Sequence, residues 1–303
     1  MAGELGGVAA AVLSSTLGGA AVAVTRFMTG TLDPLAIGAL RFGIGVAVLL
    51  PFALMRRAAW PQRHDWQSVA GLGLLFFAGF PLLFNAALVF TTAARASLSL
   101  STLPLLTLAL GAALGAEALT TRKTAGVLLA MTGVALSLLA GLADAPPGAW
   151  RGDLLMVGAA LCMAFYSVLS RPVLCRCDPL AFTAAAMGVG APCLAVAALA
   201  RGSFRPVEAL GPGQWAAVLF LGVAGTALAF ALWSLALRYT TPTRVAVSVA
   251  VNPVSASLAA SALLREPVPW TTVTGLATVL AGIGLALTEP GRRDRAEPFG
   301  RHK

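Results

Sequence analysis

Charged residues are scarce in this sequence, and the scarcity decides its class. Asp, Glu, Lys and Arg make up 11% of the 303 residues, whereas hydrophobic residues make up 58% and the mean hydropathy is +0.85. A soluble domain has about a quarter of its residues charged. This chain has too few polar groups to cover a surface in water, so its solvent is predicted to be the lipid bilayer.

Residues that carry catalytic or metal chemistry are also few. The chain has four Cys and two His. Cys175 and Cys177 form a C-x-C pair with no second Cys or His pair near them. His64 and His302 lie outside the apolar runs, and no HExxH, GxSxG or Walker A pattern occurs. We therefore expect no enzyme, no metal site, no cofactor and no direct use of ATP.

Ten apolar runs of about 20 residues, the length that crosses a bilayer as a helix, divide the chain. They cover roughly residues 7–28, 34–55, 67–89, 94–116, 124–142, 152–170, 179–200, 214–237, 244–264 and 270–288. The connections between them are too short for a soluble domain. The predicted fold is an all-α integral membrane protein with ten transmembrane helices.

The basic residues predict the orientation of these spans. The net charge of +9 comes without the clustered basic and aromatic residues of a nucleic-acid-binding surface, so no nucleic acid is expected as a partner. With the N-terminus inside, the inner loops and tail hold fourteen Lys and Arg, and the outer loops hold six. The positive-inside rule then places both termini in the cytoplasm. The expected location is the plasma (inner) membrane.

One pattern occurs twice along the chain. The stretches "TTAARASLSLSTLP" at 91–104 and "TTPTRVAVSVAVNP" at 240–253 share two Thr, an Arg, a Ser and a closing Pro at an offset of 149. At an offset of 145, "DPLA" at 33–36 recurs at 178–181. The first register also matches Trp66 with Trp215, Glu117 with Glu266, and Gly126 with Gly275. Chance similarity between two apolar segments would match common residues such as Ala and Leu. It does not readily match Trp, Arg, Pro and Glu in one register, so the chain is predicted to contain an internal duplication.

The duplication has an odd number of spans in each copy, so the second copy enters the membrane inverted. Residues 1–142 form the first repeat, 143–151 a linker, 152–289 the second repeat and 290–303 a basic cytoplasmic tail. Inverted repeats of this kind build many secondary transporters, whose substrate site lies near the midplane between the copies.

The chain resembles the EamA-type branch of the drug/metabolite transporter superfamily over about residues 5–288. The matching features are a Pro followed thirteen residues later by Glu in "LPLLTLALGAALGAE" and "NPVSASLAASALLRE", a Gly nine residues beyond each Glu, and "AFYSVLSRP" opening the second half. The resemblance implies a ten-helix exporter with a central cavity between the halves, to which the fourth and ninth helices contribute.

Polar residues on the fourth and ninth spans are candidates for lining that cavity. Ser248, Asn252 and Ser255 share one face of the ninth span, and Ser99 and Thr102 form a shorter version on the fourth. The alternative is that these hydroxyls only bond helix to helix. Further candidates for substrate binding are Asn85, Trp233, Tyr166 and Ser14.

Pro104 and Pro253 lie near the middle of the fourth and ninth spans. Each lacks an N–H and leaves the carbonyl of Leu100 or Val249 without its usual donor. The doubled position favours a hinge beside the site over a static kink.

Five charged residues are candidates for boundary or gating roles: Arg95, Arg244, Glu117, Glu266 and Arg41. Arg41 lies about 10 Å inside the second span. Three roles are open for it: binding a carboxylate or phosphate, packing within the protein, or extending outward to the interface. The two Glu residues end their helices and are expected to be mainly structural.

These patterns predict a secondary transporter that exports small metabolites, with amino acids or related compounds first. The alternatives are a multidrug or cationic compound exporter of the same family, and a passive facilitator or channel. The expected partners are the small-molecule substrate and the lipid bilayer. Protons are a candidate coupling ion, although no Asp or Glu lies at the centre of a span. The oligomeric state is not predicted.

Overall fold

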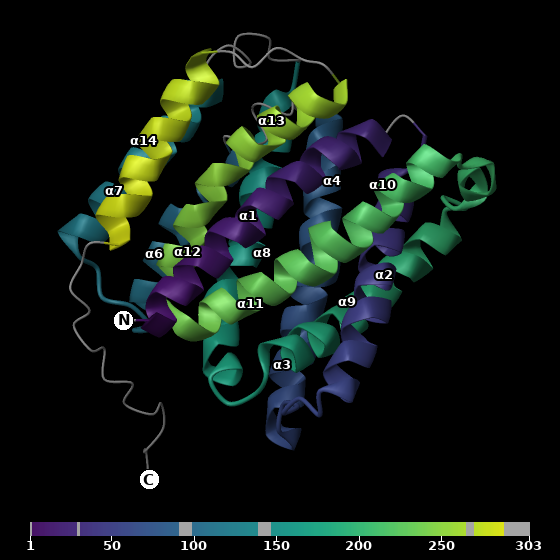
Figure 1. Ribbon diagram of the computed structural model, residues 1–303, viewed down its shortest axis with the longest axis horizontal. Helices are drawn as coiled ribbons and strands as arrows, with labels where there is room; N and C mark the ends of the chain where they lie inside the picture. The colour runs from purple at the N-terminus through teal and green to yellow at the C-terminus, as the bar shows by residue number, and fades with distance from the viewer. Residues whose placement is uncertain (1, 29–30, 91–98, 139–146, 265–269, 288–303) are drawn as a thin grey trace.

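The computed structural model describes residues 2–28, 31–90, 99–138, 147–264 and 270–287, and every regular element in these ranges is helical (Figure 1). The all-helical prediction is therefore confirmed for the described part of the chain. The predicted tail at 290–303 lies outside the described residues.

The first half of the chain begins with two long helices, α1 (Ala2–Met28) and α2 (Pro34–Met55). A short 3₁₀ turn, η1 (Arg63–Asp65), precedes α3 (Trp66–Leu74), which continues through the π-helical segment η2 (Leu75–Gly79) into α4 (Phe80–Phe90). The half ends with α6 (Leu103–Ala113) and α7 (Thr121–Leu138).

The second half follows the same order of elements. It begins with α8 (Ala149–Leu174) and α9 (Pro179–Ala200), and a 3₁₀ turn, η4 (Arg205–Ala209), leads on to α10 (Pro212–Gly222). The π-helical segment η5 (Val223–Leu228) joins α10 to α11 (Ala229–Tyr239). The 3₁₀ turn η6 (Val249–Val251) joins α12 (Pro242–Ser248) to α13 (Asn252–Leu264), and α14 (Trp270–Leu287) follows.

Six of the described helical segments are long and apolar enough to cross a membrane: Gly3–Thr25, Pro34–Met55, Arg63–Phe84, Ala149–Leu174, Pro179–Ala200 and Pro212–Tyr239. Each coincides with a predicted span, so a multi-pass membrane protein is confirmed at this level. The crossing of the other four predicted spans stays a prediction.

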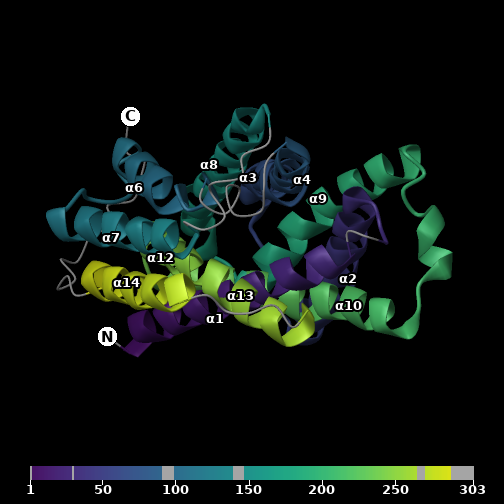
Figure 2. The same ribbon diagram turned by 90° about the horizontal axis from the view of Figure 1, so that it is seen from above.

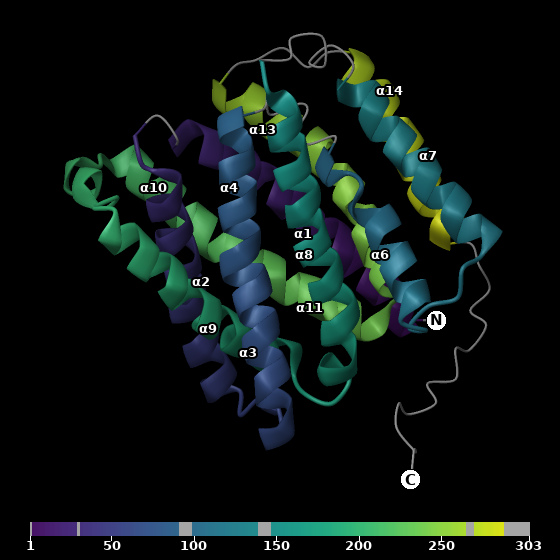
Figure 3. The ribbon, with the colours of Figure 1, turned by 180° about the vertical axis from the view of Figure 1, so that it is seen from behind.

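Helices of the two halves pack on one another reciprocally. Helix α1 packs on α11 and α13 of the second half, and α8 packs on α4 and α6 of the first (Figures 1 and 3). Helix α2 packs on α9, and α7 packs on α14. Figure 2 shows the α7 and α14 pair at one end of the molecule and α2, α9 and α10 at the other. Each half therefore supplies the partners of the other half's helices.

The repeated "DPLA" stretch starts α2 and α9 in the same way. Asp33 caps α2 by accepting the N–H of Leu35 at 2.8 Å, and Asp178 caps α9 by accepting the N–H of Leu180 at 2.8 Å. A proline follows each cap at the first helical position, where a missing N–H costs nothing. Because α2 and α9 pack on each other, the two caps strengthen the same interface.

The doubled prolines coincide with breaks in the helices. Pro104 lies in the first turn of α6, directly after a turn at 101–102. Pro253 lies in the first turn of α13, directly after the 3₁₀ turn η6 that holds Val249. Proline removes the donor that would continue an α-helix, so both helices change geometry at this level. Whether these breaks act as hinges stays a prediction.

The two π-helical segments also occupy equivalent places, since η2 begins at Leu75 and η5 at Val223. Such bulges insert an extra residue into a turn and are frequent at functional sites. The sequence patterns described above did not predict these two π-helical segments.

Candidate functional site

Two predicted site serines lie where α1 meets the second half. Ser15 and Ser248 share a hydrogen bond of 2.8 Å, and Ser248 Oγ also lies 3.1 Å from the Ala11 carbonyl. Ser14 donates to the Ala229 carbonyl at 2.7 Å. In this conformation Ser14 and Ser248 therefore bond helix to helix, which is the alternative interpretation of their sequence pattern.

Asn252 lies one turn further along the same face. Within the described part of the chain, its Oδ1 is buried and has no hydrogen-bond partner. Gly18 of α1 faces the Asn252 amide, and Gly19 lies against Ser255, whose hydroxyl bonds back to the Val251 carbonyl at 3.2 Å. The two glycines let α1 approach α13 closely, and Asn252 is left as an acceptor without a donor.

Trp233 and Tyr166 lie in the central core. Tyr166 stacks on Phe76 with ring centroids 4.3 Å apart, and Phe77 and Phe230 complete the ring cluster. Trp233 is 2% exposed, and its Nε1 has no hydrogen-bond partner among the described residues. The central core thus combines aromatic faces with a buried donor at Trp233, and the unpaired acceptor of Asn252 lies at the contact of α1 with α13.

The structure adds two groups of residues that the sequence did not single out. Thr183 of α9 donates to Ser234 of α11 at 2.7 Å, and both are fully buried. Phe76 and Phe77 form the centre of the aromatic cluster from the π-helical segment η2. The run "FFAGF" at 76–80 is the sequence signal that marks this cluster.

Several predicted site residues are not placed beside these groups. Ser99 and Thr102 are partly exposed, and the Thr102 hydroxyl donates to the Ser99 carbonyl at 2.7 Å. Arg95, Glu266 and the side chain of Asn85 lie outside the described residues.

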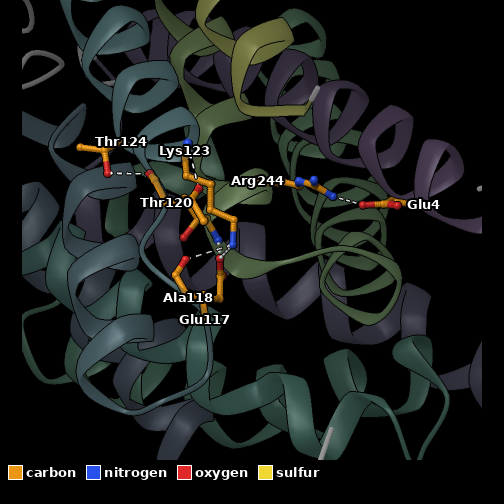
Figure 4. Close-up of polar contacts among 8 residues, drawn as sticks. Glu4, Glu117, Ala118, Thr120, Lys123, Thr124 and Arg244 are labelled. Carbon is orange, nitrogen blue, oxygen red and sulfur yellow. Dashed lines mark hydrogen bonds and ion pairs between the residues drawn. The ribbon is translucent and has the colours of Figure 1, made fainter. Parts of the chain in front are cut away.

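Bonds between the halves lie at the predicted cytoplasmic end (Figure 4). Glu117, which follows α6, accepts the backbone N–H of Thr243 at 2.8 Å and the Lys123 ammonium at 3.3 Å. Arg244, the next residue of α12, forms an ion pair with Glu4 of α1 (Figure 4). The start of α12 is thereby tied to both α1 and the end of α6.

Burial of the side chains changes along the ninth predicted span. All seven residues of α12 are buried, and so are the three of η6. From Asn252 onward, buried residues such as Val254 and Ser255 alternate with partly exposed or exposed ones such as Asn252 and Leu258. The packing is therefore tighter at the end that carries Glu117 and Arg244.

Arg41 turns toward the other half of the molecule. Its Nε donates to Thr226 Oγ1 at 2.6 Å, and its Nη2 donates to the Gly225 carbonyl at 2.6 Å. Both partners belong to the π-helical segment η5. Of the three roles open in the sequence, packing within the protein describes this conformation.

Metal-ligating side chains do not gather in the described part of the chain. No cluster of three His, Cys, Asp or Glu side chains lies close enough to hold a metal ion in the described ranges. The chemistry of the centre is that of hydrogen bonding and aromatic packing.

Comparison with known proteins places the chain in a family. The sequence model of the EamA-like transporter family matches it twice, over residues 5–139 and 150–288. A chain of known crystal structure is similar with a TM-score of 0.77 at 24% identity, covering 95% of this chain and 98% of that one. That likeness concerns the fold alone.

Three curated relatives are similar over most of their length. An uncharacterized transporter of Archaeoglobus fulgidus is 31% identical over 84% of this chain and 88% of its own. The aromatic amino acid exporter YddG of Ancylobacter novellus is 31% identical over 77% and 78%. A probable terminal-alkyne amino-acid exporter of Streptantibioticus cattleyicolor is 27% identical over 80% of both chains. With two family matches that together span nearly the whole sequence, this chain belongs to the EamA-like transporter family.

Proposed function

We propose that this protein is a secondary transporter that exports amino acids or closely related metabolites by alternating access. Two relatives named for amino-acid export, at 31% and 27% identity, support the substrate class. The apolar surface and the mixed aromatic and polar core suit small, partly apolar cargo. The expected location is the plasma membrane with both termini in the cytoplasm.

The reciprocal packing of the two halves is the observation that carries this proposal. Each half's first helix packs on the third and fourth helices of the other half, and the second and fifth helices pair with their own counterparts. In each copy, helices pack on helices of the other copy. If the second copy is inverted in the membrane, two arrangements of the copies, one open to each side, have similar energy. Ten spans in two inverted repeats would then open the centre to either side in turn.

We propose that this conformation is closed at the predicted cytoplasmic end. The Glu117 bond to Thr243 and the Glu4 bond to Arg244 support this, because both join the two halves at that end. We propose that inward opening breaks these bonds and bends the fourth and ninth helices at Pro104 and Pro253. The separation of α1 from α12 would release Ser14 and Ser248 beside Asn252 and Trp233, and Ser99, Thr102, Ser255, Asn85 and Tyr166 would complete the site.

Counterflow in proteoliposomes tests this function. Vesicles loaded with a panel of unlabelled amino acids are tested for saturable uptake of a labelled one without an imposed gradient. We expect uptake for apolar and aromatic amino acids and a loss of about tenfold in Asn252→Leu, because the variant removes the buried acceptor. Thr132→Val is the matched control, since Thr132 is exposed and bonds only to its own helix.

The outcomes separate the alternatives. Flat traces across the panel would exclude amino acids as cargo, and the same assay with cationic drugs would follow. Uptake that does not saturate would indicate a channel. A pH gradient imposed on the same vesicles tests protons as the coupling ion. A proton-coupled carrier would use this gradient to accumulate the substrate against the substrate's concentration gradient.

A further inference from the structure

A groove of about 650 Å³ lies at the predicted outer end, between the start of α2, the α4 helix and the end of α9. Its walls are mainly apolar and include Leu82, Leu83, Phe90 and Ala197. Binding sites for small molecules have volumes of about 300–1,000 Å³ with apolar walls and few polar groups. The groove has the size and the lining of such a site, and neither Tyr166 nor Trp233 lines it.

Two opposite charges also line this groove, Asp33 at the start of α2 and Arg201 at the end of α9. Both side chains are exposed, and within the described residues neither has an ionic partner. Asp33 accepts the Leu35 N–H with Oδ1 only, so its second oxygen remains an acceptor. An apolar groove is thus bordered by one anion and one cation that do not neutralise each other.

We infer that this groove binds the zwitterion of an apolar or aromatic amino acid. The substrate ammonium would pair with Asp33 and the substrate carboxylate with Arg201, which can hold a carboxylate with two parallel hydrogen bonds. The side chain would lie against Leu82, Leu83 and Phe90. The inference rests on the proposed export of amino acids and adds a second site, where cargo leaves the protein on the outer side.

The charge pattern selects against simpler ligands. A monoamine leaves Arg201 unpaired, and a monocarboxylate leaves Asp33 unpaired. Both charges are satisfied by a zwitterion, and the apolar walls favour an amino acid whose side chain is large and uncharged. A phospholipid with an ammonium and a phosphate is the competing occupant, which the test below distinguishes.

The test measures counterflow of external labelled phenylalanine in proteoliposomes that contain the full-length protein. Asp33→Asn keeps the helix cap, because Asn caps helices as well as Asp does, and removes the charge. We expect Asp33→Asn and Arg201→Gln each to raise the external half-saturation concentration about tenfold or more. Asp33→Asn should lose discrimination against 3-phenylpropionate, and Arg201→Gln should lose discrimination against 2-phenylethylamine.

Asp178→Asn is the matched control, because Asp178 caps α9 as Asp33 caps α2 but lies at the opposite end of the helix pair. It should leave the external half-saturation unchanged. Unchanged half-saturation and unchanged discrimination in both groove variants would overturn the inference. The inference would also be overturned if the two variants changed the half-saturation concentration only in vesicles that contain phosphatidylethanolamine and not in vesicles of phosphatidylcholine. The groove would then be a lipid-binding site.

Equilibrium dialysis of labelled phenylalanine against the purified protein separates this inference from the proposed function. Binding that weakens in Asp33→Asn and Arg201→Gln would support the groove even if no vesicle carried an amino acid, and only the transport proposal would then fail. Transport by the wild type with unaltered binding and selectivity in both variants would leave the export proposal standing and reject the groove.

Discussion

Two equivalent helix interfaces of this protein are built in different ways. In one, α9 packs on α3 and η2 of the first half; in the other, α2 packs on α10 and η5 of the second. A Cβ at Gly190 of α9 would lie 2.6 Å from the Gly73 carbonyl, so these backbones touch. At Gly45, the equivalent position in α2, the atoms nearest to an added Cβ belong to the side chains of Thr226 and Met187.

Position 41 and its equivalent, 186, explain part of this difference. Arg41 extends from α2 and donates to the Gly225 carbonyl of η5. Ala186 of α9 has no side chain to extend, and its carbonyl lies 2.3 Å from where a Cβ of Gly73 would be. At one interface a small residue lets the backbones touch, and at the other an arginine bridges the two segments with hydrogen bonds. Equivalent positions in a duplicated fold therefore need not share a chemical role.

The largest expected effect comes from filling the glycines of the two interfaces. Gly190→Ala forces a Cβ against backbone and the Cβ of Phe77, which cannot move alone, so we expect a loss of stability of about 3 kcal/mol. Gly45→Ala meets movable side chains and should cost about 1 kcal/mol. Thermal unfolding of both variants in detergent measures the difference, and equal losses would mean that the two interfaces are alike.

A smaller effect is expected from the hydrogen bonds of Arg41. Arg41→Met and Thr226→Val each remove the bond between Nε and Oγ1, so the double variant should be less destabilised than the sum of the singles by about 1 kcal/mol. A double-mutant cycle on unfolding free energies measures this coupling. Strict additivity would show that the bond adds nothing to the α2 interface.

The smallest effect concerns two cysteines just before α9, the helix that packs on α3 and η2. Cys177 is 3% exposed, and its burial raises the pKa of the thiol to about 11, whereas Cys175 is exposed. Because only the thiolate reacts, Cys177 stays protonated at neutral pH and reacts faster only as the pH rises toward that value.

Labelling with a membrane-impermeant maleimide at pH 7 should therefore modify Cys175 and spare Cys177, as mass spectrometry of tryptic peptides would show. Inside-out vesicles should label Cys175 and right-side-out vesicles should not, because its loop is predicted to be cytoplasmic. Equal labelling of the two thiols would show that this end of the interface opens readily. Labelling of Cys175 from outside only would reverse the predicted orientation.

Much of this fold could be read from repeated residues. Pro104 and Pro253 marked the two helix breaks because proline acts on its own helix whatever surrounds it. The predicted spans 34–55 and 179–200 begin at the residues where α2 and α9 begin, although the "DPLA" stretches there were interpreted only as a repeat. The π-helical segments were not predicted, because no residue in η2 or η5 breaks an α-helix on its own as proline does.

The candidate site was predictable only in part. The stripe of Ser248 and Asn252 was found from spacing, but spacing does not tell whether a hydroxyl meets a ligand or a neighbouring helix, and Ser248 meets Ser15. The groove at Asp33 and Arg201 was not predicted at all. Those residues lie far apart in the sequence, and each has an ordinary place at a helix end.

The exchange of first helices between the halves also has a consequence for synthesis. Helix α1 ends at Met28, but its partner α11 ends only at Tyr239, about 200 residues later. At a translation rate of about 5–20 residues per second, α1 waits about 10–40 s for that partner. During this interval its serines and glycines face lipid or a chaperoning protein, so the nascent chain is most vulnerable before the second half is complete.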